Sequence, residues 1–226
     1  MSTSHTALSG IQLLIFDLDG TLVDSKKDLA LSVNAMREQM GLGPLSDDLI
    51  ASYVGQGVTV LVRRALSEQT TDEEVEKAVQ IFLQHYRLHM LDNTTAYPGV
   101  RDALEELRTR KLTVLTNKPV NFSREMLTRL GISDYFSFIY GGNSFDQKKP
   151  SPVGVKSLIR DLAVTPQRTL MVGDSETDVL TGRNAGVWTC GVTYGFGAHT
   201  LEDALPDLVL GDLRDLPLLL NGTSGG

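Results

Sequence analysis

Short apolar runs and helical patterns alternate along most of the chain. The first run, Leu13 to Phe16, is unbroken and has the length of a strand. Further strand-like runs follow at 112–116, 136–140, 169–172, 187–192 and 208–210. Apolar runs without alternation are typical of strands buried on both faces of a parallel sheet. Together with the helical stretches between them, they predict an α/β fold with a doubly wound, Rossmann-like parallel sheet and helices on both faces.

One region, from about 25 to 92, contains helical patterns and no convincing strand. Its apolar side chains recur every three or four residues, at Leu29, Val33, Met36 and Met40 and again at Val75, Val79, Phe82, Tyr86 and Met90. Ser46 and the capping box Thr71-Asp72-Glu73-Glu74 are typical helix starts. We therefore expect a helical cap at 25–92, inserted after the first strand of a catalytic core that comprises 1–24 and 93–226.

Composition argues against several classes of partner. The 226 residues carry a formal net charge of -7, and no run of Lys and Arg is dense enough to follow a phosphate backbone, so we expect no nucleic-acid partner. No apolar stretch approaches the length of a membrane span, and the N-terminal residues do not resemble a secretory signal. The single Cys190 fits a reducing compartment. These features predict a soluble cytoplasmic protein, and they leave both a monomer and a homodimer open.

Several predicted strands are followed by polar residues that an ordinary core would not need. They are Asp17 with Asp19, Thr116 with Asn117, Lys149 before Pro150, and Asp174 with Asp178. The strands of an open parallel sheet end at one edge, and ligands bind in the crevice outside it. Carboxylate oxygens suit a hard cation such as Mg²⁺, whereas hydroxyl, amide and ammonium donors suit a phosphate. The combination predicts a metal-dependent phosphoryl site.

The order of these residues resembles the four motifs of the haloacid dehalogenase superfamily. Asp17-Leu18-Asp19-Gly20-Thr21 is similar to the first motif, and Thr116, Lys149 and the segment 173–178 match the second, third and fourth. The resemblance covers essentially the whole chain, since the helical insert lies where this superfamily carries its small α-helical cap.

The resemblance implies a role for each residue of the core motifs. Asp17 would be the nucleophile that forms an aspartyl-phosphate. Asp19 would protonate the leaving alcohol and later deprotonate the hydrolytic water, and its main-chain carbonyl would bind the metal. Lys149 would neutralise Asp17 and the phosphoryl group together. Mg²⁺ would be held by Asp17, Asp19 and Asp174, while Asp178, one helical turn further on, would hold metal-bound water or the lysine.

The resemblance also implies residues that bind the substrate. Thr116 and the amide around Asn117 would bind phosphate oxygens, and Gly20 would permit close approach of the backbone to the phosphate. In the insert, Gln56 would contact the substrate. The glycines on either side of Gln56 stand beside a helix start, where they could expose amides to a small carboxylate or simply separate two helices. Both interpretations of these glycines stay open.

Asp19 favours transfer to or from an alcohol oxygen, because dehalogenases of this superfamily lack a second aspartate there. We therefore expect a Mg²⁺-dependent phosphomonoesterase that hydrolyses a small phosphorylated metabolite through an aspartyl-phosphate. Within the superfamily the chain is most similar to the phosphoglycolate phosphatases, through segments 53–57 and 116–118, which makes 2-phosphoglycolate the leading substrate. The alternatives are a β-phosphoglucomutase-like sugar-phosphate mutase, a sugar phosphatase and, without catalysis, a receiver-like phosphoacceptor. The large insert and Asp19 argue against the phosphoacceptor.

Overall fold

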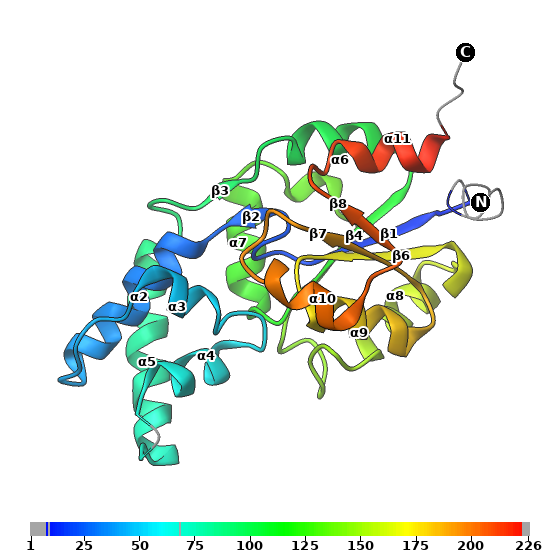
Figure 1. Cartoon of the computed structure of the whole chain (residues 1–226). Helices are drawn as coiled ribbons and strands as arrows, with labels where there is room; N and C mark the ends of the chain where they lie inside the picture. The colour runs from blue at the N-terminus through cyan, green and yellow to red at the C-terminus, as the bar shows by residue number, and fades with distance from the viewer. Residues whose placement is uncertain (1–7, 9, 68, 223–226) are drawn as a thin grey trace.

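A six-stranded parallel sheet forms the centre of the molecule. The structure is a computed structural model that describes residues 8, 10–67 and 69–222. Neighbouring strands pair in parallel in the order β5-β4-β1-β6-β7-β8. Their bounds are Leu13–Phe16 (β1), Lys111–Leu115 (β4), Phe138–Tyr140 (β5), Thr169–Gly173 (β6), Trp188–Val192 (β7) and Leu208–Leu210 (β8). The predicted α/β sheet is confirmed, with β1 between β4 and β6 (Figure 1).

Helices cover both faces of this sheet. They are α6 (Val100–Leu107), α7 (Val120–Arg129), α8 (Val153–Asp161), α9 (Glu176–Ala185), α10 (Leu201–Ala204) and α11 (Asp215–Asn221). In β1, Leu14 and Phe16 pack in the apolar cluster that includes α6 and α7, whereas Leu13 and Ile15 pack in the cluster that includes α8. Because successive side chains of a strand point to opposite faces, a strand covered on both sides needs an unbroken apolar run. In the part of the chain that the structure describes, no helix has the length and apolar character of a membrane span.

Four helices form the cap that the sequence predicted. They are α2 (Lys26–Gln39), α3 (Asp47–Ala51), α4 (Val58–Ala65) and α5 (Asp72–His89). The capping box at the start of α5 is present, with the Thr71 hydroxyl accepting from the Glu74 amide and the Glu74 carboxylate accepting from the Thr71 amide. Figure 1 shows this group of helices to one side of the sheet, beyond the ends at which the strands stop. The cap therefore stands over the edge where the predicted site residues are expected.

The two linkers between the cap and the core are joined to each other. β2 (Val23–Asp24) and β3 (Thr95–Ala96) pair as a short antiparallel ribbon. Beside it, the buried Asp28 carboxylate accepts from both the main chain and the side chain of Asn93 and Thr94. Two-residue strands are too short to leave a hydrophobic pattern, and this ribbon has no counterpart among the predicted elements. It holds together the points at which the chain leaves and re-enters the core.

Candidate active site

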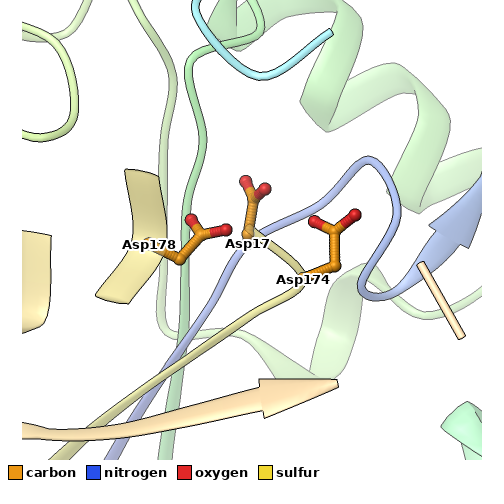
Figure 2. Close-up of side chains that lie close together, drawn as sticks. All are labelled: Asp17, Asp174 and Asp178. Atoms are coloured by element: carbon orange, nitrogen blue, oxygen red, sulfur yellow. The ribbon is translucent and has the colours of Figure 1, made fainter. Parts of the chain in front are cut away.

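Three buried carboxyl groups meet at the end of the sheet. Asp17 directly follows β1, Asp174 directly follows β6, and Asp178 lies in the first turn of α9. One carboxylate oxygen from each residue lies within 4.8 Å of the others. Figure 2 shows Asp17 between the other two. Because the parallel strands end at a common edge, acids that are far apart in the sequence come together here, as the sequence predicted.

Burial makes this cluster of acids unfavourable without a cation. Removal from water is the largest cause that raises the pKa of Asp17 to about 7, and Lys149 opposes this shift. Burial likewise raises the pKa of Asp174 well above its ordinary value, and the charges of Asp178 and Asp17 add to that shift. The protein therefore keeps acids in a position where their charges repel, which indicates a positively charged partner.

One lysine compensates part of this charge. Nζ of Lys149 is buried and lies 2.7 Å from Oδ1 of Asp17 and 2.6 Å from Oδ1 of Asp178. Its approach to Asp17 does not follow a hydrogen-bond direction, so Oδ1 of Asp17 accepts no hydrogen bond from the described residues. The three carboxylates and one ammonium group leave two negative charges uncompensated, and buried charge is costly unless it is paired. Mg²⁺, a divalent cation that prefers oxygen ligands, fits this set of donors.

The turn after β1 is packed against Asp174. Gly20 has φ +87°, and a Cβ atom at this position would lie 2.2 Å from Oδ2 of Asp174. The amide of Gly197 donates to the same oxygen at 2.8 Å, and the Thr21 hydroxyl lies 3.5 Å from Oδ1. Gly20 was predicted to let the backbone approach a phosphate. The structure gives a different reason for this glycine, because the space that a side chain would need is filled by the Asp174 carboxylate.

We expect Gly20→Ala to lower both stability and activity. The alanine would have to keep the left-handed backbone conformation of Gly20, which costs about 1–3 kcal/mol in a non-glycine residue. It would also displace Asp174, and a shift of about 1 Å in a site group can lower the rate about 100-fold. Thermal unfolding and kcat for phosphate release measure the two effects.

Gly41→Ala is the matched control for this prediction. Gly41 has φ +73° but no atom of the described residues within 4 Å of the added Cβ atom, so the variant tests the backbone cost without a steric clash. We expect it to lose some stability and to keep the wild-type kcat. A Gly20→Ala enzyme with a kcat equal to that of Gly41→Ala would contradict the proposed displacement of Asp174.

Asp19 is not one of the three clustered acids and has partners of its own. Nζ of Lys118 lies 3.0 Å from Oδ1 and 3.2 Å from Oδ2 of Asp19, and the Ser25 hydroxyl donates to Oδ1 at 2.5 Å. Lys118 also donates to the Tyr86 hydroxyl at 2.7 Å, so a side chain of the cap helix α5 contacts it. The two aspartates of the first motif therefore have different partners: Asp17 lies with Asp174, Asp178 and Lys149, and Asp19 lies beside Lys118 and Ser25.

Lys118, Ser25 and Tyr86 were not among the predicted site residues. Ser25 directly precedes α2, but its hydroxyl forms no cap hydrogen bond there. Tyr86 was assigned to the apolar face of its helix, which is correct for its ring, since the residue is buried. Only Lys118 left a signal, because it stands two residues after Thr116 and so near the end of a strand. Ser25 and Lys118 contact Asp19 directly, and Tyr86 contacts it only through Lys118.

The side chain of Asn117 is occupied by the protein itself. Its Nδ2 donates to the carbonyls of Gly55 at 2.8 Å and Lys149 at 3.0 Å, and its Oδ1 accepts from the Lys149 amide at 2.9 Å. An amide side chain has two N–H donors, and both are used here. This leaves the main-chain amide, and not the side chain, as the group that Asn117 offers to a phosphate. The side chain links the cap loop at Gly55 to the segment that carries Lys149.

A small cavity lies between the cap and the core. Asp17, Asp19 and Thr116 line it on the core side. Apolar side chains supply much of its remaining wall, chiefly Val54, Val58, Leu61, Phe82, Leu83 and Phe122. Its volume is about 50 Å³, which is room for roughly four waters at the ~10–15 Å³ that one enclosed water needs. In this arrangement the cavity accommodates a group of only a few heavy atoms.

Gln56 departs from its predicted position at the substrate. Its neighbours Gly55 and Gly57 line the cavity, but the Gln56 side chain is exposed and accepts a hydrogen bond from Arg64 at 2.9 Å. On either side of Gln56, Val54, Gly55, Gly57 and Val58 line the cavity. The cap loop therefore approaches the site with the backbone of its two glycines and with two apolar side chains.

The chain is similar to several known proteins along nearly its whole length. Residues 14–192 match the family described as haloacid dehalogenase-like hydrolase. A phosphoglycolate phosphatase of Chromobacterium violaceum is 42% identical over 216 residues, which cover 92% of this chain and 97% of that protein. The phosphoglycolate phosphatase of Neisseria meningitidis is 39% identical over 222 residues, 94% of each chain. The crystal structure of a predicted phosphoglycolate phosphatase from Haemophilus somnus has a TM-score of 0.87 at 33% identity and covers 92% of this chain and 96% of that chain.

The chain belongs to the haloacid dehalogenase-like hydrolase family. This confirms the resemblance inferred from its four motifs and the predicted parallel-sheet core with an inserted helical cap. Its enzyme class is that of a phosphoric monoester hydrolase, as the second aspartate of the first motif indicated.

Proposed function

We propose that this enzyme is a Mg²⁺-dependent phosphomonoesterase whose preferred substrate is 2-phosphoglycolate. The observation that carries the proposal is the placement of Asp17 beside both Lys149 and Asp174, with Asp19 apart from them at the same cavity. An attacking carboxylate needs nearby positive charge, and a proton-transfer group needs a position beside the leaving group. The names of the curated relatives support the choice of substrate.

In the proposed reaction Asp17 is the nucleophile. Its carboxylate attacks phosphorus, a bond forms between Asp17 and the phosphoryl group, and the bond from phosphorus to the alcohol oxygen breaks. Lys149 lies within ion-pair distance of Asp17 and reduces the repulsion between the two anions. Water then attacks phosphorus, and the bond to Asp17 breaks to give free phosphate and the original carboxylate.

Asp19 moves the protons in both steps. It gives a proton to the alcohol oxygen as that oxygen leaves, and it takes a proton from the attacking water in the second step. Lys118 and Ser25 fix the position of its carboxyl group, and residues of the cap line the cavity beside it. The apolar walls of the cavity limit the access of water during transfer to Asp17.

The acidic cluster is the proposed metal site. Asp17, Asp174 and the main-chain carbonyl of Asp19 would hold Mg²⁺, and Asp178 would hold Lys149, to which it is already bonded. When bound, Mg²⁺ supplies positive charge that stabilises the phosphoryl group in the transition state.

The size of the cavity supports a small leaving group over the sugar-phosphate alternatives. A hexose has about twelve non-hydrogen atoms, whereas the cavity has a volume of about 50 Å³, or roughly four waters. A sugar-phosphate mutase or sugar phosphatase would need a wider closed site. The glycolate portion of 2-phosphoglycolate, with one methylene and one carboxylate, is small enough to fit.

Release of phosphate from a panel of small phosphomonoesters tests the proposal, in Mg²⁺ and with a chelator. We expect 2-phosphoglycolate to have the highest kcat/KM and the chelator to abolish turnover. Because the metal offsets repulsion among buried acids, Mg²⁺ should also raise the Tm of the free enzyme, and Asp174→Asn should remove most of this increase. Isomerised sugar phosphate in place of free phosphate, or full turnover in chelator, would contradict the proposal.

A further inference from the structure

We propose that Lys118 binds the anionic group of the substrate's leaving portion, a carboxylate on the carbon that carries the ester oxygen. The inference rests on the proposed function and adds the residue that selects the substrate. It also gives Lys118 a role in substrate choice that is separate from its contact with Asp19.

Lys118 is the one cationic side chain among the described residues that line the cavity. Lys149, the other buried lysine of the site, is bonded to Asp178 and paired with Asp17 at the phosphoryl end, outside the cavity lining. The two lysines therefore divide the site. Lys149 lies where a transferred phosphoryl group would be, and Lys118 lies beside Asp19, the group proposed to protonate the leaving oxygen.

Lys118 is buried among partners that suit a cation. Its Nζ lies 3.0 Å from Oδ1 of Asp19 and donates to the Tyr86 hydroxyl at 2.7 Å. An ammonium group has three N–H donors. In the free enzyme these donors face both carboxylate oxygens of Asp19 and the Tyr86 hydroxyl, so a substrate anion would replace one of these contacts, and the longest of them is the 3.2 Å contact to Oδ2 of Asp19.

The apolar walls make a positively charged partner necessary for a carboxylate. A carboxylate that leaves water for a pocket lined by leucine, valine and phenylalanine side chains loses its hydration and needs a charged hydrogen-bond donor in return. In the same low-dielectric surroundings the attraction between ammonium and carboxylate is stronger than in water. A neutral leaving group of the same size fits these walls but gains nothing from Lys118. The cavity therefore selects small phosphorylated acids over small phosphorylated alcohols.

A comparison of 2-phosphoglycolate with ethyl phosphate tests this role. The two esters differ by the carboxylate, which ethyl phosphate replaces with a methyl group. We expect wild-type enzyme to prefer 2-phosphoglycolate in kcat/KM, and Lys118→Met to reduce that preference by roughly 10–100-fold, the value of a charged hydrogen bond. Lys118→Arg should restore part of the preference. Tyr86→Phe removes the hydroxyl partner but leaves the charge, so it should keep the wild-type preference.

Because Lys118 also contacts Asp19, its substitution is expected to lower kcat for both esters, and only the ratio reports on the carboxylate. Binding of the two esters to Asp17→Asn enzyme in Mg²⁺, with and without Lys118→Met, measures the same preference without turnover. An equal loss for both esters in rate and in binding would overturn the inference while leaving the proposed function intact. A wild-type enzyme that releases phosphate from no small phosphomonoester would instead overturn both.

Discussion

Replacement of Asp17 by Asn is expected to lower kcat for phosphate release by at least ~10⁴-fold, the scale on which the loss of a catalytic nucleophile acts. The neutral amide is a poor nucleophile towards phosphorus and cannot form the aspartyl-phosphate. The fold should survive, because asparagine has nearly the same shape and the change removes one of three mutually repelling buried acids. Phosphate release and urea unfolding measure the two expectations on the same preparation.

Asp24→Asn is the matched control for this variant. Asp24 ends β2 close to the first motif in sequence, but its side chain is exposed and accepts a hydrogen bond from the Lys26 amide. The control makes the same chemical change outside the acidic cluster and should keep the wild-type kcat. If Asp17→Asn retained Mg²⁺-dependent turnover within tenfold of wild type, Asp17 would not be the nucleophile.

Lys149→Met is expected to have the largest effect on stability. The substitution leaves Asp17 and Asp178 buried without their cationic partner, and breaking a buried ion pair in this way costs about 3–5 kcal/mol. Phosphate release should be lost as well, since the attacking carboxylate and the phosphoryl anion would meet without compensation. Urea unfolding in the absence of divalent metal gives the loss of stability, and repeating it with Mg²⁺ should recover part of that loss.

The adjacent Lys148 provides the control for Lys149→Met. Its side chain is exposed, so Lys148→Met should change the free energy of unfolding by no more than about 0.5 kcal/mol. Equal stability of the two variants would show that Lys149 does not compensate the acids. If Mg²⁺ did not reduce the loss of stability in Lys149→Met, that loss would arise from altered packing and not from uncompensated charge.

Both predictions concern residues that local patterns in the sequence already mark as candidates. The run Leu13 to Phe16, the two aspartates that follow it and the strands at 112–116 and 169–172 are such patterns. The parallel pairing of these strands determines that their carboxyl ends meet, so Asp17, Thr116 and Asp174 could be assigned to one edge of a sheet. The helical cap was equally visible, because helices of ten residues or more leave a clear period in the sequence.

The partners of these residues were decided by the tertiary structure. Lys118 is 99 positions from Asp19 in the sequence. Tyr86 contacts Lys118 from the cap helix α5, so this contact depends on how the cap packs against the core. The role of Gly20 follows from a carboxylate more than 150 residues away, which occupies the space beside it. Neither contact has a period or a spacing that a sequence pattern could reveal.

By itself, the sequence determined the parallel-sheet core and the presence of a helical insert, and it predicted that Asp17, Lys149 and Asp174 belong to the site. These properties follow from hydrophobic period and from the shared edge of a parallel sheet, which are local or topological. The tertiary structure alone decided that Gln56 faces outward, that the Asn117 side chain is occupied, and that the cavity is small and apolar. Side-chain direction and the closeness of cap to core depend on packing across the whole molecule, which no segment of the sequence specifies alone.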